Sequence, residues 1–431
     1  MALFRRFNSD QRGAVAMMFG LAALPLVGLA GAAVDYSRAA IEQTKLQRAT
    51  DAAVLTLVRE PRTATPGQLA ARAESVMRSL YRPAAGISLA TPEVQRVGSS
   101  IVVRAQARVP NGLLQVVGLR DTAVASESRV NGSMERIEIA LVLDNTGSMA
   151  ERFDGRVKIE ELRSAAVKLV DDLRDIAASP DDVRVSIVPF DTEVRLDAGR
   201  YRYRDWLRLK SADRAGWTGY IVDRDTPKDV SDTPPVAALT GTLYPALAKS
   251  EWASRGLGDL VPVQPLISLH ERAAYEAVTG TIKSMRPRGN TNVGLGVAWG
   301  TATLTGSVPL DTPSTSDPRG VRRYMVVLTD GENTQRYVDG EVRRPHSASK
   351  WDPTLRMMNA RTLSTCDTAK AKGIEVFTIR LLEGDADMLS SCASAPNAKA
   401  KQHYFDVQSS PQLKSAFESI IDSITVTRLT H

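Results

Sequence analysis

The sequence predicts an α/β fold built on a doubly wound, mostly parallel sheet, preceded by an apolar N-terminal helix and a small α+β module. Short apolar runs that end in polar loops, at residues 137–143 and 324–329, are typical of strands buried on both faces of a parallel sheet. Helical patterns alternate with such runs through residues 134–431. An uncharged run at residues 14–34 precedes a helical and then an alternating pattern, which sets the N-terminal part apart.

Residues 14–34 are predicted to cross a membrane. This run of 21 uncharged residues would span about 31 Å as a helix, close to the roughly 30 Å hydrocarbon core of a bilayer. The arginine-rich residues 1–13 favour a cytoplasmic N-terminus, so residues 35–431 are expected in the periplasm of a bacterium. The alternative is a cleaved signal peptide, because residues 30–32 (Ala-Gly-Ala) are similar to a cleavage site. The run is longer than the apolar region of most signal peptides, which favours an anchor.

The helical pattern continues from residue 36 to residue 59. Leu46, Ala49, Ala53 and Leu57 share one face of this helix. Residues 11–58 resemble the N-terminus of TadG-like proteins of bacterial Tad (Flp) pilus assembly systems, on motifs that occur together: the apolar run, Val34-Asp35, Leu46-Gln47 and Asp51-Ala52-Ala53. The resemblance implies an anchored component of pilus assembly. The glutamate that pilin-like TadE relatives carry near the start of the run is missing here, which favours a permanent anchor over prepilin-type processing.

Residues 35–133 are expected to form the TadG-like stalk and the α+β module. Residues 101–109 and 122–130 alternate between apolar and polar side chains, which predicts half-buried strands. Residues 111–119 between them are expected to form a short helix.

The main domain is expected to cover residues 134–431. Residues 195–270, which are rich in aromatic residues and arginine, are predicted to be an insertion in it. Such an insertion is either a covering subdomain with its own small core or a surface for a partner. After the strand at 137–143, the sequence predicts a helix at 157–178, a strand at 183–190, helices at 273–285 and 293–303, a strand at 324–330, a helix at 362–372, strands at 374–380 and 403–407, and a helix at 412–424.

The loop after the strand at 137–143 carries the order Asp144-x-Thr146-x-Ser148. In open α/β sheets ligands bind outside the carboxyl ends of the strands, and oxygen side chains suit a hard cation. The order resembles the first segment of the metal-ion-dependent adhesion site of von Willebrand factor type A domains, whose pattern is Asp-x-Ser-x-Ser. That family also needs a threonine before a helix and an aspartate after another buried strand; Thr291 and Asp330 occupy such positions.

The resemblance implies a von Willebrand factor A-like fold from about residue 137 onward. It also implies an Mg²⁺ or Mn²⁺ ion that the hydroxyls of Thr146, Ser148 and Thr291 bind directly, while Asp144 and Asp330 act through water. Such an ion keeps an open position for a carboxylate of a protein partner. Taken singly, each of these residues is equally explained by helix capping or turn formation. The neighbouring Glu332 and Asn333 are expected at the loop surface.

Cys366 and Cys392 are the two cysteines of the chain. In an oxidising compartment they are candidates for a disulfide. The alternative is a pair of buried free thiols that pack as small apolar side chains.

The charge and the motifs of the chain argue against several classes of function. The net charge of +6 is small for 431 residues, and no basic run with interleaved aromatics supports nucleic-acid binding. No small-molecule substrate is evident, and the motifs of serine hydrolases, zinc proteases and P-loop enzymes are missing from the sequence. We therefore expect a non-enzymatic, single-pass protein of the bacterial inner membrane. Its periplasmic domain is expected to bind other pilus-assembly or envelope proteins. The alternatives are a surface adhesin using the same site and an Mg-dependent hydrolase.

Overall fold

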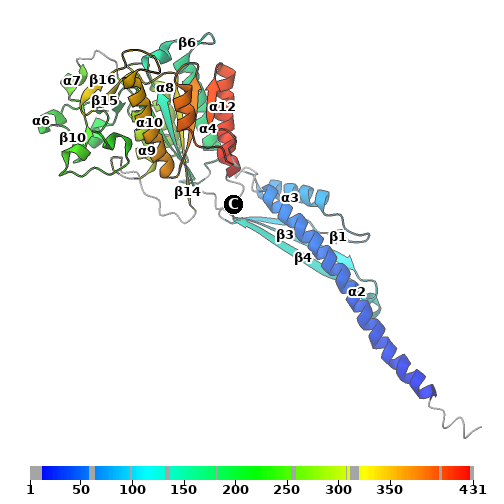
Figure 1. Ribbon diagram of the computed structural model, residues 1–431. Coiled ribbons are helices and arrows are strands. Elements are labelled where there is room, and N and C mark those ends of the chain that lie inside the picture. Colours follow the sequence, from blue (N-terminus) through cyan, green and yellow to red (C-terminus); the bar gives the residue numbers. More distant parts are fainter. Residues whose placement is uncertain are drawn as a thin grey trace, which may run out of the picture. The chain divides into compact units, whose positions relative to one another are not determined.

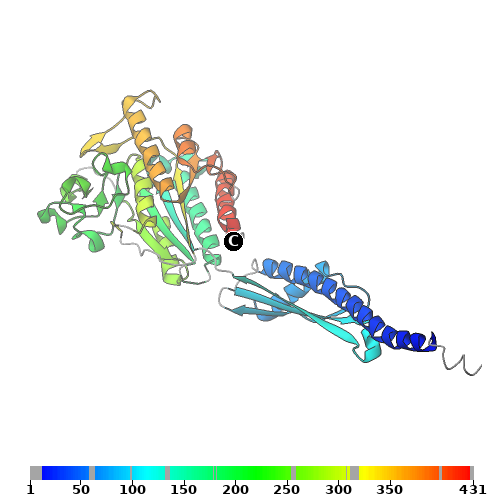
Figure 2. The same cartoon turned by 60° about the horizontal axis from the view of Figure 1, so that its bottom comes forward.

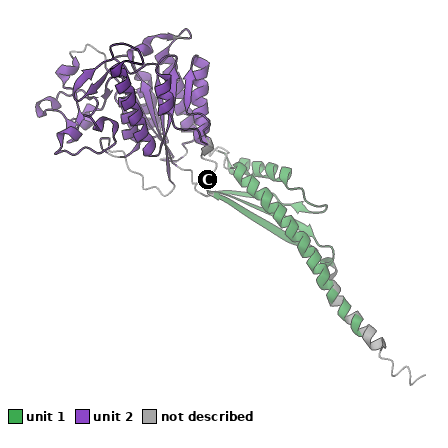
Figure 3. Ribbon diagram, viewed as in Figure 1, with its two compact units in different colours: residues 1–133 green, residues 134–431 purple. Residues whose placement is uncertain are grey.

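The computed structural model divides the chain into two compact units, Met1–Ser133 and Met134–His431 (Figure 3). Each unit is described by itself. The structure describes residues 12–57, 64–97, 100–131, 136–177, 179–180, 182–253, 259–306, 308–310, 320–397 and 400–427.

The N-terminal unit consists of a long helix packed on an antiparallel sheet (Figures 1 and 2). Its elements are α2 (Arg12–Leu57), α3 (Pro66–Leu80), β1 (Ser88–Leu89), β2 (Glu93–Val97), β3 (Ser100–Pro110), the 3-10 helix η1 (Leu114–Val117) and β4 (Asp121–Asn131). The predicted helix face is confirmed: Leu46, Ala49, Ala53 and Leu57 are at most 2% exposed, within a core that includes residues of β3 and β4.

Of the helix predicted at residues 111–119, the structure contains only the 3-10 helix η1, and Asp35 binds the backbone at its start. Its carboxylate accepts the backbone N–H groups of Gly112, Leu113 and Leu114 at 2.8–2.9 Å. These bonds, that of Leu114 first, lower the pKa of Asp35. The aspartate of the Val34-Asp35 motif is therefore a structural link between α2 and η1.

The predicted membrane span at residues 14–34 lies inside α2. Several of its side chains lie outside the described residues, as does most of the predicted cytoplasmic segment, residues 1–11. Within the part of the chain that the structure describes, no helix is both long and apolar enough to cross a membrane.

A six-stranded sheet forms the centre of the C-terminal unit. Its strands lie in the order β13 (Gln264–Ser268), β8 (Val183–Phe190), β5 (Arg136–Asp144), β14 (Val321–Thr329), β17 (Ile374–Leu381) and β18 (Tyr404–Val407). Five strands are parallel, and β13 pairs antiparallel with β8 at one edge, so the sheet is mixed. The predicted insertion at 195–270 was therefore too long, since β13 belongs to the sheet. The sequence did not predict this strand because it contains Pro265, and proline is tolerated in strands mainly at an edge of the sheet.

Helices cover both faces of this sheet, as the strand pattern predicts (Figure 1). The side chains of Ile139 and Leu141 alternate with those of Ala140 and Val142 along β5, and the two pairs belong to different cores. The helices are α4 (Lys158–Asp175), α8 (Arg272–Ser284) and α12 (Ser410–Thr427) on the first face, and α9 (Val293–Leu304), α10 (Pro353–Ala371) and α11 (Ala386–Cys392) on the second. Helix α10 begins earlier than predicted because Asp352 caps it and Pro353 occupies its first turn.

The part of the chain between β8 and β13 forms short helices and strands. They are β9 (Val194–Arg195), α5 (Ala198–Tyr201), β10 (Leu207–Arg208), α6 (Ser211–Arg214), β11 (Tyr220–Ile221), η3 (Lys228–Val230), η4 (Thr240–Thr242), β12 (Tyr244–Pro245) and α7 (Lys249–Ala253). Trp206 and Tyr244 are buried, and Tyr244 packs against Trp299 of α9. These aromatic side chains pack inward, but they belong to the second core of the sheet and not to a separate small core of the insertion. The remaining elements are η2 (Gly147–Ala150), β6 (Arg152–Phe153), β7 (Arg156–Val157), β15 (Arg336–Val338) and β16 (Glu341–Arg343).

Candidate metal centre

The five predicted metal ligands lie at the carboxyl ends of β5 and β14. Asp144 ends β5, and Asp330 follows directly after β14. These two strands are neighbours, and the chain runs from β5 to β8 on one side before it returns to β14 on the other. The strand order therefore reverses between them, which is where open α/β sheets bind ligands.

Hydrogen bonds join four of the five residues or their backbone. Ser148 Oγ donates to Asp330 Oδ1 at 2.7 Å and lies 3.1 Å from Thr146 Oγ1. Asp144 accepts the backbone N–H of Thr146 at 2.8 Å through Oδ1 and the hydroxyl of Thr329 at 2.5 Å through Oδ2. Thr329, the last residue of β14, was not predicted as part of the site. Its position directly before Asp330 is the signal that could have identified it.

Thr291 reaches the same place from the loop before α9. A Cβ at Gly331 would lie 3.2 Å from Thr291 Oγ1 and 3.8 Å from Ser148 Oγ. Both hydroxyls therefore lie close to Gly331, the residue after Asp330. The loop is fixed to the Asp144 loop by the bond from Gly147 N–H to Gly289 O, at 3.1 Å. Gly289 has a φ of +70°, and a Cβ there would meet Asp191 Oδ2 at 2.8 Å, so the loop requires glycine at this position.

The two carboxylates are fully buried and repel each other. Asp144 and Asp330 are each 0% exposed. Burial, and then the charge of Asp330, raise the pKa of Asp144 to about 7. A carboxyl group in this position is costly to ionise unless a cation compensates it.

A buried cation that was not predicted lies beside the site. Lys158, the first residue of α4, is 1% exposed, and its Nζ lies 2.8 Å from Asp330 Oδ2. The same Nζ lies 2.8 Å from Glu151 Oε2. Burial lowers the pKa of Lys158, but the hydrogen bonds to Asp330 and Glu151 leave it above its ordinary value. In the sequence, Lys158 stands one helical turn before the buried Leu162, which places it on the apolar face of α4.

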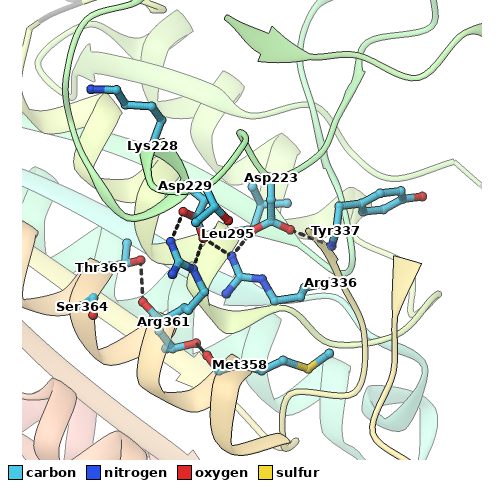
Figure 4. Close-up of polar contacts among 12 residues, drawn as sticks. Asp223, Lys228, Asp229, Leu295, Arg336, Tyr337, Met358, Arg361, Ser364 and Thr365 are labelled. Atoms are coloured by element: carbon cyan, nitrogen blue, oxygen red, sulfur yellow. Dashed lines mark hydrogen bonds and ion pairs between the residues drawn. The ribbon is translucent and has the colours of Figure 1, made fainter. Parts of the chain in front are cut away.

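Buried charged side chains join the segment between β8 and β13 to the loop before α9 and to β15. Asn292, which follows Thr291 and caps α9, donates its amide to Asp223 Oδ2 at 2.7 Å. Arg336 in turn lies 2.7 Å from Asp223 Oδ1 and 2.9 Å from Asp229 Oδ2. Arg361 of α10 also binds Asp229 (Figure 4). These contacts fix the backbone beside Thr291 from residues far apart in the sequence.

Asn333 is not at the loop surface, contrary to expectation. It is 2% exposed, its Oδ1 accepts the N–H of Val293 at 2.9 Å, and its amide donates to Asn359 and Thr362. Local composition suggests a surface loop here, whereas the tertiary structure uses Asn333 to hold the start of α9. Glu332 is half-buried, and burial raises its pKa.

Cys366 of α10 and Cys392 at the end of α11 are joined by a disulfide with a Cα–Cα distance of 5.3 Å. Both side chains are fully buried in the second core. The disulfide ties α11 to α10 on the face of the sheet that carries α9.

The donors of the candidate centre are mainly hydroxyls. Among the described residues, no group of three or more histidine, cysteine, aspartate or glutamate side chains could hold a metal ion. The five residues supply two carboxylates and three hydroxyls, so the cluster depends on Thr146, Ser148 and Thr291.

Two family models match separate parts of the chain. The model described as putative Flp pilus-assembly TadE/G-like matches residues 13–56. The model of the von Willebrand factor type A domain matches residues 259–419. No curated protein matches the chain.

The comparison with solved structures finds proteins that are distant in sequence from this chain. The pilus adhesin SpaC from Lactobacillus rhamnosus GG is 15% identical over 78% of this chain and 34% of its own, with a TM-score of 0.41. This chain thus spans about a third of the SpaC structure. The PilB minor pilin from Streptococcus sanguinis is 14% identical over 81% of this chain and 80% of its own (TM-score 0.39). The vWF domain of the type V pili tip protein Mfa5 from Porphyromonas gingivalis is 11% identical over 68% and 96% (TM-score 0.39). The chain therefore contains a TadE/G-like segment near its N-terminus and a von Willebrand factor type A domain in its C-terminal unit.

Proposed function

We propose that the C-terminal unit binds a protein partner through a divalent cation, Mg²⁺ or Mn²⁺, at the centre formed by Asp144, Thr146, Ser148, Thr291 and Asp330. The observation that carries this proposal is the convergence of three hydroxyls and two buried carboxylates at the point where the strand order reverses. The protein then acts as a binding component and not as an enzyme.

The residues present fit such an ion. Hydroxyl and carboxylate oxygens are the donors that Mg²⁺ prefers. Burial, and then the charge of Asp330, raise the pKa of Asp144, and a cation between the two loops would offset both effects. The hydroxyls of Thr146, Ser148 and Thr291 would hold the ion, and the charges of the two aspartates would neutralise it. When bound, the ion offers an acceptor position for a carboxylate of the partner.

The N-terminal unit indicates where in the cell the protein would act. We propose that the helix over residues 14–34 anchors the protein in the bacterial inner membrane with the C-terminal unit in the periplasm. The TadE/G-like segment supports a role in Tad pilus assembly, with other pilus or envelope proteins as the partners.

Metal titration by calorimetry tests the centre. Asp144→Ala is expected to abolish uptake of Mg²⁺ and Mn²⁺, because it removes a carboxylate at the end of β5. Thr146→Ser is the matched control and is expected to bind the metal, because the hydroxyl remains. Thr146→Val keeps the shape and loses the oxygen, so it is expected not to bind. Equal uptake by the wild type and Asp144→Ala would contradict the proposal and return these residues to capping and turn roles.

Reporter fusions test the proposed location. A periplasm-specific reporter fused after His431 is expected to be active, and a cytoplasm-specific reporter at the same place inactive. The opposite pattern would exclude the proposed orientation. A mature protein that begins at about residue 33 would show cleavage in place of anchoring. Cross-linking in membranes, with wild type and Asp144→Ala compared, then identifies the partners that depend on the centre.

A further inference from the structure

Lys158 places a buried positive charge beside the proposed divalent cation. Its ammonium lies 2.8 Å from Asp330 Oδ2, while Ser148 occupies Oδ1 of the same carboxylate. Glu151 is the second partner of this ammonium, and its side chain is 61% exposed. Water therefore weakens the interaction of Glu151 with the ammonium in part, whereas the contact between Lys158 and Asp330 is buried on both sides.

The position of Lys158 is unfavourable for a purely local role. Lys158 is the first residue of α4, where the aligned peptide dipoles disfavour a cation and favour acids such as Glu160 and Glu161. Burial of an ammonium is costly unless it is paired and hydrogen-bonded. The charge at this place is thus stabilised mainly by Asp330, across 172 residues of sequence, and it belongs to the centre.

We infer that Lys158 is a resident counter-cation of the metal centre, which weakens the binding of a divalent cation and leaves the loaded centre with a net positive charge that selects an acidic partner group. This inference rests on the proposed function. The charges of Asp144, Asp330 and a divalent ion cancel, so Lys158 supplies the excess charge, which the exposed Glu151 compensates only in part. A centre with this balance binds its metal modestly alone and more tightly when a partner carboxylate completes it.

The inference predicts opposite changes in two affinities when the charge is removed. In Lys158→Met the side chain keeps its length, and Asp330 is left without its counter-ion. We expect the variant to bind Mg²⁺ at least about tenfold more tightly than the wild type, because a like charge near the ion has been removed. We expect its Mn²⁺-loaded form to bind acetate at least about threefold more weakly, because the centre is then formally neutral.

Two further variants make the comparison specific. Lys158→Arg keeps the charge and is expected to bind metal and acetate as the wild type does. Lys168→Met changes a lysine on the same helix that is 65% exposed and pairs with Asp172, and it is expected to leave both affinities unchanged. The full-length protein is used throughout, with its tryptophan fluorescence and circular dichroism as the check that each variant is folded.

The measurements are calorimetric titration with Mg²⁺ and Mn²⁺, and water-proton relaxation of the Mn²⁺-loaded protein during titration with acetate. Tighter metal binding together with weaker acetate binding in folded Lys158→Met supports the inference. If metal binding is unchanged, or if both affinities fall together, Lys158 has only a structural role and the inference is wrong while the metal centre stands.

If Lys158→Met does not fold, the variant Glu151→Gln decides. It removes the exposed partner of the ammonium and leaves the positive charge of Lys158 less compensated. Weaker metal binding in Glu151→Gln supports the inference, and unchanged binding contradicts it. If the wild type takes up neither metal, the proposed function fails, and this inference fails with it.

Discussion

Asp144→Asn is expected to stabilise the metal-free protein at neutral and alkaline pH while it abolishes metal binding. The wild-type carboxyl is buried beside Asp330, and these two causes raise its pKa from 3.8 to about 7. Asparagine has nearly the same shape. Its oxygen can accept the N–H of Thr146, and its amide can donate to the hydroxyl of Thr329, so the variant keeps the local contacts and loses only the charge.

The pKa shift fixes the size and the sign of the effect. The pKa of Asp144 is higher in the folded protein than in the unfolded chain, so its contribution to stability is fully present below about pH 4 and is lost as the pH rises through about 7. A shift from 3.8 to about 7 corresponds to about 4 kcal/mol at full ionisation. The asparagine side chain of the variant does not titrate, so the free energy of unfolding of the variant should exceed that of the wild type by up to about 4 kcal/mol near pH 8 and by much less near pH 5.

Urea unfolding of the full-length protein in EDTA, followed by tryptophan fluorescence, measures this difference. All five tryptophans lie in the C-terminal unit, so the signal reports on that unit alone. Mg²⁺ added near pH 8 should stabilise the wild type and not the variant. If the difference between the two proteins does not change with pH, or if the variant is the less stable near pH 8, the carboxyl is not destabilising and the reasoning is refuted.

Three further changes test the packing around the site. Gly300→Ala on α9 should lower the free energy of unfolding by about 1–3 kcal/mol, because the new Cβ would lie 2.6 Å from the side chain of Val142. Gly280→Ala on α8 is the control: no atom lies within 4 Å of its new Cβ, so it should raise the free energy of unfolding by about 0.5–1 kcal/mol. Asp223→Asn should lower the free energy of unfolding and weaken metal binding, although burial raises the pKa of Asp223. The amide group of asparagine would face one of the donors that the carboxylate now accepts, which are Arg336, Asn292 and the N–H of Tyr337. Arg343→Met breaks an exposed pair with Glu341 and should cost less than about 1 kcal/mol, and a changed metal affinity in this control would count against a specific role of Asp223. The double change Cys366→Ala/Cys392→Ala should cost about 3 kcal/mol in urea unfolding, and an unchanged midpoint would show that the bridge does not form in solution.

Strands and helices with a clear apolar period were predictable from the sequence. The strand at 183–190 has the predicted bounds, and β5, β14 and β17 are close to theirs. Each of these strands is a nearly continuous apolar run, because successive side chains point to opposite faces of the sheet and both faces are buried. Elements without such a pattern were missed: β13 is an edge strand with a proline, and α11 is short and capped by Asp385.

The five residues of the candidate centre, Asp144, Thr146, Ser148, Thr291 and Asp330, were named from the resemblance to the adhesion-site pattern. From the sequence alone we also expected them to meet at the carboxyl ends of the strands, and the structure brings them close to one another beside β5 and β14. Only the tertiary structure showed which buried charged side chains contact these residues and their neighbours. Lys158 reaches Asp330, and Asp223 reaches Arg336, across more than a hundred residues of sequence. Periodicity shows which side of an element is buried, whereas the pairing of a buried charge depends on which distant side chain the folded chain brings within a few ångströms.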